Sequence, residues 1–219
     1  MSKRKDIFWM ALMAIMFFVL LLPISSYTAA VPILIDEWDL NNLQTGAIFS
    51  AYLIGYVMSA VLIIPLTDRI SQGLVLIASS LLFTLSHIVF ALYVNDISIA
   101  VLVRMLGGVG LVGVYMPGVR LIVDRFPEKM RGISVGLFVT AQYFAHSCSL
   151  LVSASLIGIY AWRDAYLIVA LISSAGVLLA FLLVRRSIKT TFTEGSGKFD
   201  VKVLRNPSVR YLIVGYSLH

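Results

Sequence analysis

The sequence has few charged residues and a single cysteine. Only 13% of its 219 residues are charged, whereas soluble domains carry about 25%. The one cysteine, Cys148, excludes an internal disulfide framework and any multi-cysteine metal site. Apolar residues take the place of charge, because 60% of the chain is hydrophobic and its mean hydropathy is +0.96. This composition excludes an ordinary soluble domain and is typical of a protein embedded in a lipid bilayer.

Six long apolar runs are separated by short polar breaks. A helix needs about 20 apolar residues to cross a bilayer, and each run reaches that length. The expected spans are about 7–35, 45–66, 74–94, 97–123, 133–159 and 165–184. The first is too long for the apolar core of a signal peptide, and its prolines predict a bend near Pro23 and an end near Pro32. The predicted fold is an all-α membrane protein, with a six-transmembrane-helix bundle over residues 1–186.

The composition changes after Arg186. Residues 187–208 are polar and contain Gly195-Ser196-Gly197, so we expect a cytoplasmic linker there. Residues 209–219 turn apolar again, but this stretch is too short to cross a bilayer. We expect it to be the start of a seventh helix that is cut short.

Basic residues are distributed unevenly between the two sides of the predicted bundle. With the N-terminus inside, one side collects Lys3, Arg4, Lys5, Arg69, Arg120, Arg125, Lys129, Arg131, Arg185, Arg186, Lys189, Lys198, Lys202, Arg205 and Arg210. The opposite side holds only Arg163. Cytoplasmic loops are rich in Lys and Arg, so this bias predicts a multi-pass protein of the cytoplasmic (inner) membrane with a cytoplasmic N-terminus. It also accounts for the net charge of +6 without a nucleic-acid partner.

Arg104 lies inside the fourth apolar run and is followed by Gly107, Gly108 and Gly110. A guanidinium at membrane depth costs about 2.5–3.5 kcal/mol on insertion scales, so it should face a protein interior or a wet cavity. Glycines remove side chains from one side of a helix and let another backbone approach. We therefore expect a closely packed helix that presents a fixed positive charge.

Several short motifs occur in a fixed order along these runs. They are Asp68-Arg69 after the second run, Arg104 with Gly108 and Gly110 in the fourth, Arg131-Gly132 before the fifth, and Trp162-Arg163 before the sixth. This order resembles the N-terminal half of a major facilitator superfamily transporter. The resemblance implies a 3+3 helix repeat, alternating access between two halves, and a missing C-terminal six-helix half as partner. It implies a small-molecule substrate and no cofactor or metal.

The resemblance also implies a gate at the cytoplasmic end. Asp68–Arg120 and Arg69–Asp124 are the expected ion pairs, which would hold this side shut in one state and break in the other. The alternative interpretation is that these four residues are ordinary solvated loop charges, worth less than about 1 kcal/mol.

Candidate substrate-binding residues are polar or phenolic side chains within the spans. They are Arg104, Tyr27, Tyr52, Tyr56, Tyr115, Gln142 and His146. A membrane-depth cation without a membrane-depth acid favours an anionic or neutral polar solute. The Gly-Pro…Gly-Gly pattern of antiporters is absent from residues 136–158, which favours proton- or ion-coupled uptake. In the alternative interpretation, Arg104 is a structural residue or extends its side chain outward to the membrane surface. His87 and His146 are then packing residues that do not bind substrate or carry protons.

Residues 132–136 form a Gly-x-Ser-x-Gly pattern centred on Ser134, as around the nucleophile of many hydrolases. That chemistry needs a nearby histidine, but His146 would lie about 18 Å along the same helix. Gly132 and Gly136 instead predict a small-residue packing face. The preferred interpretation is therefore a transporter and not an enzyme. A membrane-embedded serine hydrolase and a six-helix dimer acting as scaffold or sensor are the alternatives.

Overall fold

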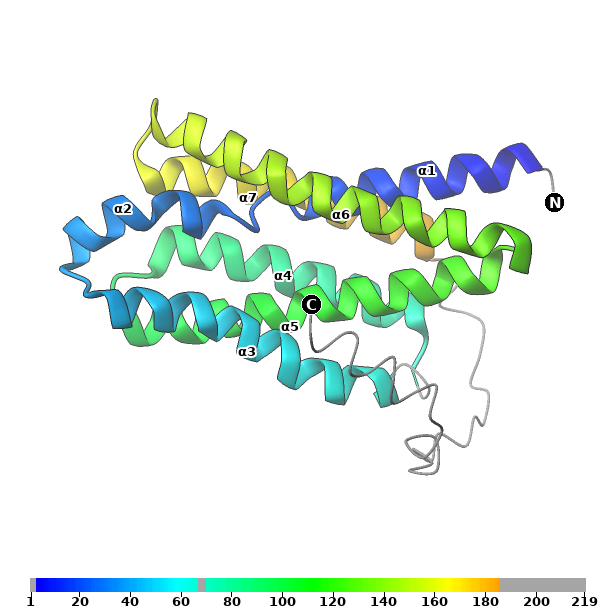
Figure 1. Ribbon diagram of the computed structural model, residues 1–219, viewed down its shortest axis with the longest axis horizontal. Coiled ribbons are helices and arrows are strands. Elements are labelled where there is room, and N and C mark those ends of the chain that lie inside the picture. The colour runs from blue at the N-terminus through cyan, green and yellow to red at the C-terminus, as the bar shows by residue number, and fades with distance from the viewer. Residues whose placement is uncertain (1–2, 67–69, 186–219) are drawn as a thin grey trace.

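The computed structural model describes residues 3–66 and 70–185, with the side chains of residues 62–66 left aside. Over these residues α-helices joined by short turns make up the regular secondary structure (Figure 1). The helices are α1 (Lys3–Leu20), α2 (Ser26–Trp38), α3 (Asn42–Leu66), α4 (Gln72–Tyr93), α5 (Ile97–Arg125), α6 (Glu128–Ile157) and α7 (Trp162–Val184). The proposed gate residues Asp68 and Arg69, the linker and the seventh apolar stretch lie outside the described residues.

Helices α1 and α2 follow one another along the long axis of the bundle and are separated by a break around Pro23 (Figure 1). The expected end near Pro32 is wrong, because α2 continues through Pro32 to Trp38. An interior proline removes one backbone hydrogen bond, but Tyr27 and Leu34 bury their side chains completely on either side of it. That burial holds the helix together past the proline.

The break between α1 and α2 exposes backbone groups that hydroxyl side chains satisfy. Ser173 Oγ donates to the Leu20 carbonyl oxygen at 2.6 Å and lies 3.0 Å from Thr84 Oγ1. The Ser25 N–H donates to Ser149 Oγ at 2.9 Å. Because lipid offers no hydrogen bonds to a broken helix, these partners on α6 and α7 are what allow the break at membrane depth, with Thr84 of α4 bonded in turn to Ser173.

Helices α3 to α7 are each long and apolar enough to cross a membrane. Helix α2 has only 13 residues, and α1 begins with the charged stretch from Lys3 to Asp6, so neither qualifies alone. Placed in line, they supply one further crossing (Figure 1). The all-helical transmembrane fold is confirmed.

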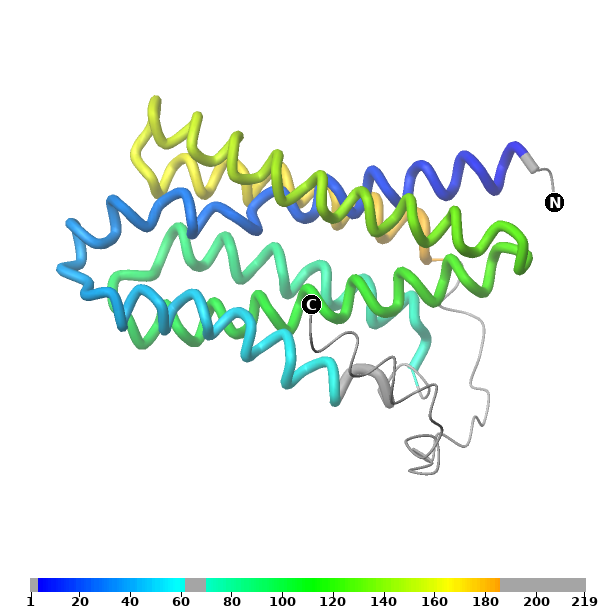
Figure 2. The backbone as a smooth tube through the Cα atoms, viewed as in Figure 1, coloured from blue at the N-terminus to red at the C-terminus, as the bar shows by residue number. Residues whose placement is uncertain are grey.

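Helices α3 and α5 cross at two glycines. A Cβ built on Gly108 would overlap the Tyr52 carbonyl oxygen, and one built on Gly55 would overlap the Met105 carbonyl oxygen. Figure 2 shows the two helices crossing and then diverging. The backbones therefore touch at this crossing, and any side chain here would force them apart.

The other glycines singled out from the sequence differ in their surroundings. A Cβ on Gly110 would lie 2.6 Å from the Phe83 backbone nitrogen, so α5 approaches α4 closely as well. Within the described residues, a Cβ on Gly132 or Gly136 would meet nothing within 4 Å. These two glycines therefore mark no close helix contact in this part of the chain.

Candidate functional site

Arg104 is buried where α2, α3 and α5 meet, with a relative exposure of 4%. Its guanidinium carbon lies 4.4 Å from the ring centroid of Tyr52 and 5.0 Å from that of Tyr27. Tyr52 and Gly55 are one turn apart on α3, as are Arg104 and Gly108 on α5, so the glycine crossing brings the phenol onto the cation. Both ring faces stabilise the charge by cation–π attraction.

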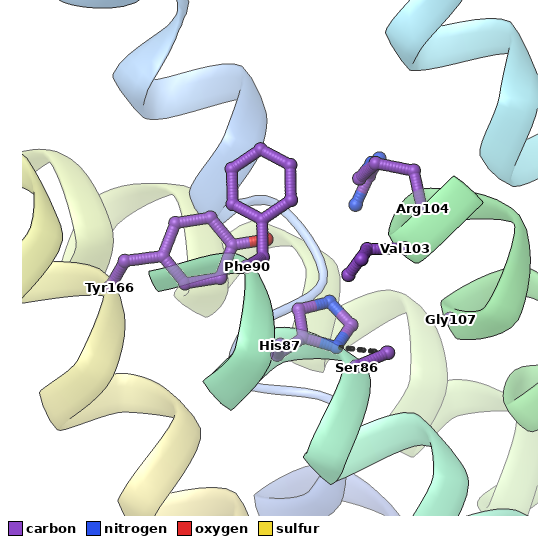
Figure 3. A pocket seen from close by; sticks show the side chains of 7 residues that line it. All are labelled: Ser86, His87, Phe90, Val103, Arg104, Gly107 and Tyr166. Carbon is purple, nitrogen blue, oxygen red and sulfur yellow. Dashed lines mark hydrogen bonds between the residues drawn. The ribbon is translucent and has the colours of Figure 1, made fainter. Parts of the chain in front are cut away.

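A narrow void adjoins Arg104 on the side of α4 and α7 (Figure 3). It is lined by Ser86, His87, Phe90, Val103, Arg104, Gly107 and Tyr166. The rings of Phe90 and Tyr166 stack with centroids 5.1 Å apart and form an aromatic wall. The void is too narrow to admit a water molecule in this conformation.

Several buried polar atoms around Arg104 have no hydrogen-bond partner among the described residues. They are Nε and Nη1 of Arg104, the hydroxyls of Tyr52 and Tyr166, and Nε2 of His87. No Asp or Glu in the described part of the chain forms an ion pair with Arg104. Buried polar groups are normally paired, so a cluster of unpaired ones around a cation is a candidate binding site.

A second, larger cavity of about 640 Å³ lies between α3, α5 and α6. Its lining consists of Tyr56, Tyr115, Met116, Val119, Arg120, Val123, Gln142 and Tyr143. Tyr56 lies one turn beyond Tyr52 on α3, so the open cavity and the closed Arg104 pocket are neighbours along one helix.

The candidate substrate residues thus divide between two places. Arg104, Tyr27 and Tyr52 are in mutual contact, while Tyr56, Tyr115 and Gln142 line the open cavity. His146 lines neither the cavity nor the void. Its Nδ1 lies 2.9 Å from the Gln142 carbonyl oxygen, one turn back on the same helix.

The candidate gate residues are only partly described. Arg120 lines the open cavity, and the exposed Asp124 accepts a hydrogen bond of 3.4 Å from Gln72 Nε2. Because Asp68 and Arg69 lie outside the described residues, the Asp68–Arg120 and Arg69–Asp124 pairs stay a prediction.

An unpredicted ion pair ties the start of α1 to the end of α5. Arg125 donates to Asp6 Oδ1 from Nη2 at 2.9 Å and from Nε at 3.1 Å. The guanidinium carbon also lies 4.4 Å from the ring centroid of Trp9. Asp6 and Trp9 share one face of α1 at i,i+3 spacing, which is the only sequence signal for this contact.

At the opposite end, Arg163 fastens α7 to the end of α4. It donates to the carbonyl oxygens of Ala91 at 3.1 Å and Val94 at 2.9 Å, and to Asn95 Oδ1 at 2.8 Å. The neighbouring Trp162 donates its indole N–H to Glu37 on α2. The Trp162-Arg163 motif therefore connects α7 to α2 and to the end of α4 at this end of the bundle.

Ser134 is fully buried, and its hydroxyl has no partner among the described residues. Nδ1 of His87 lies next to the Phe83 carbonyl, and Nδ1 of His146 next to that of Gln142. No histidine is hydrogen-bonded to Ser134 in the described part of the chain, so the arrangement needed for a serine hydrolase is not assembled there.

Comparisons with known proteins agree with this architecture. The sequence profile described as "Major Facilitator Superfamily" matches residues 13–218. The 4-hydroxybenzoate transporter PcaK of Pseudomonas aeruginosa is 31% identical over 138 residues, covering 63% of this chain and 30% of that protein. The gallate transporter of Pseudomonas putida is 27% identical over 159 residues, covering 72% and 35%.

A solved structure shows the same fold. The crystal structure of a bacterial homologue of the human lysosomal transporter Spinster, inward-facing and unoccupied, matches with a TM-score of 0.74 at 15% identity. The match covers 92% of this chain and 47% of that one. The chain spans about a third of the length of the curated relatives it matches. It belongs to the major facilitator superfamily, a family of membrane transporters and not of enzymes.

Proposed function

We propose that this chain is the N-terminal half of a secondary transporter that moves a small aromatic carboxylate by alternating access. The observation that carries the proposal is Arg104, a buried cation with no carboxylate partner in the described residues and with unsatisfied donors on Nε and Nη1. A carboxylate matches a guanidinium in both charge and geometry. The names of the relatives, a 4-hydroxybenzoate and a gallate transporter, support the same class of substrate.

Alternating access in this family involves two six-helix halves that move about a central site. The chain spans about a third of its curated relatives and about half of the solved structures, which supports a second half as partner. The open cavity would then face that half and lead past Tyr56 to Tyr52 and Arg104. Proton- or ion-coupled uptake, the direction favoured by the sequence, completes the proposal. A six-helix scaffold or sensor has no support from relatives that are named as transporters.

The test compares benzoate with benzamide, which has the same shape and no charge. Binding to the purified complete transporter should stabilise it against thermal unfolding in benzoate, whereas benzamide at the same concentration should leave the melting temperature unchanged. Ligand at 100 times its Kd adds about 2.7 kcal/mol of stability. Equal stabilisation by the two compounds would overturn the proposed role of the cation.

The proposed topology places the N-terminus in the cytoplasm. The start of α1, the α5–α6 turn and the end of α7 lie at one end of the bundle (Figure 1), and the basic residues gather there. In a Cys148→Ser background, new cysteines at Asn41 and Asn95 should react with a membrane-impermeant thiol reagent in intact cells. A cysteine at Ser196 should react only after permeabilisation. Labelling of position 196 in intact cells would contradict this orientation.

A further inference from the structure

His87 is held in one orientation by its own helix. The ring is 2% exposed, and Nδ1 lies 2.8 Å from the Phe83 carbonyl oxygen. A carbonyl oxygen only accepts hydrogen bonds, so Nδ1 carries the hydrogen. Ser86 Oγ donates to the same oxygen at 2.7 Å and lies 3.4 Å from His87 Nδ1.

This orientation leaves Nε2 as a bare acceptor. A second positive charge beside the buried Arg104 would be strongly unfavourable, so the ring is neutral and its one hydrogen is on Nδ1. Nε2 is buried, has no hydrogen-bond partner among the described residues, and belongs to the same void as Arg104 (Figure 3). The void therefore presents donors from Arg104 on one side and an obligate acceptor on another.

Gly107 lines the same void and lets α5 pack closely against the Ser86–His87 side of it. A Cβ at that position would lie 3.0 Å from Ser86 Oγ and 3.5 Å from His87 Cε1. Arg104 Nε and Nη1 make no hydrogen bond to any of the described residues. The guanidinium rests against the rings of Tyr27 and Tyr52, and binding of a ligand in the void would require it to shift along them.

We infer that His87 determines specificity: its Nε2 accepts a hydrogen bond from a hydroxyl group of the substrate whose carboxylate Arg104 binds. The transporter therefore selects hydroxylated aromatic acids over the unsubstituted acid. This inference rests on the proposed function and adds the group that reads the hydroxyl. A site built to bond a hydroxyl discriminates strongly against the analogue that lacks it, since its own polar atom is then buried unpaired.

The test is a binding panel of benzoate, its three monohydroxy isomers and the three corresponding methoxybenzoates on the complete transporter. Wild-type protein should bind at least one hydroxy isomer about 10- to 100-fold more tightly than benzoate. The matching methoxy acid, which keeps the oxygen but has no hydrogen to donate, should lose this advantage.

Two variants isolate the acceptor. His87→Asn can still donate to the Phe83 carbonyl but has no atom at the position of Nε2, so it should bind all the hydroxy acids only as tightly as benzoate. His87→Gln places an amide oxygen near that position and should keep part of the preference. The readout in both variants is the ratio of hydroxy-acid affinity to benzoate affinity, measured on the same preparation.

The outcomes separate the two proposals. Equal wild-type affinity for benzoate and every hydroxy isomer, or a preference that survives in His87→Asn, overturns the role of His87 and leaves carboxylate binding intact. Absence of binding by any of the acids overturns both. If His87→Asn does not fold, the methoxy acids and the His87→Gln variant provide the test. The role of His87 Nε2 as acceptor is rejected if a methoxy acid binds wild-type protein as tightly as the matching hydroxy acid. It is also rejected if folded His87→Gln binds the hydroxy acids no more tightly than benzoate.

Discussion

Replacing Arg104 with alanine should abolish transport and weaken carboxylate binding at least about 100-fold, roughly 3 kcal/mol. The guanidinium is the one buried cation of the site, and its unsatisfied donors are what a carboxylate would engage. The same variant should unfold at an equal or higher temperature, because it removes a desolvated charge that has no counter-ion among the described residues. Calorimetric binding and thermal unfolding, measured on the same preparation, test both parts.

Arg104→Lys is the matched control because it keeps the charge and loses the planar fork. Bidentate contact with a carboxylate and stacking between Tyr27 and Tyr52 both depend on that fork. We expect affinity about 10-fold weaker than wild type, with insertion and folding near normal. A purely structural arginine gives the reverse order, in which alanine loses fold and expression and lysine is nearly silent. Unchanged affinity in both variants would eliminate Arg104 as a substrate contact.

The transmembrane fold was accessible from sequence because a bilayer permits few solutions. A spanning segment must satisfy its backbone internally, so each long apolar run becomes a helix. The interruption between α1 and α2 near Pro23 was also accessible, because a proline has no N–H to donate and disrupts a helix locally. The continuation of α2 past Pro32 to Trp38 was not accessible in this way. It depends on the burial of Tyr27 and Leu34 against other helices, which the residues around the proline do not reveal.

Which side chains line the site depends on how each helix is rotated and on which helices pack beside it. Residue spacing along the sequence does not determine either. Gln142 and His146 share a helix face by their i,i+4 spacing, yet only Gln142 lines the open cavity. The orientation of His87 depends on Phe83, which carries no polar side chain. A backbone carbonyl oxygen therefore fixes the ring of His87, and no sequence pattern indicates such a contact.

Contacts between distant segments were equally hidden. Asp6 and Arg125 are 119 residues apart, and their pairing requires the start of α1 to lie against the end of α5. Gly136 and Gly108 look alike in sequence, but only Gly108 meets another backbone among the described residues. A small residue permits close approach, and the fold decides whether a helix arrives.

Gly108→Ala should be among the most damaging single substitutions outside the charged site. The added methyl group would overlap the Tyr52 carbonyl oxygen and come within 2.8 Å of the Tyr56 backbone nitrogen. Both are backbone atoms that no rotamer change can move, so α3 and α5 must separate. We expect a loss of about 2–3 kcal/mol in stability and a melting temperature lower by about 4–12 °C.

Separating α3 from α5 should also displace Tyr52 in the site. Gly108 packs against the Tyr52 backbone, and the Tyr52 ring lies against Arg104. Carboxylate affinity should therefore fall together with stability in Gly108→Ala and in its counterpart Gly55→Ala, whose methyl would overlap the Met105 carbonyl oxygen. Gly46→Ala on α3, where a Cβ meets none of the described residues within 4 Å, is the matched control and should be neutral or stabilising by about 0.5–1 kcal/mol. Wild-type melting and affinity in Gly108→Ala would show that the two backbones do not touch, and the placement of Tyr52 against Arg104 would need another cause.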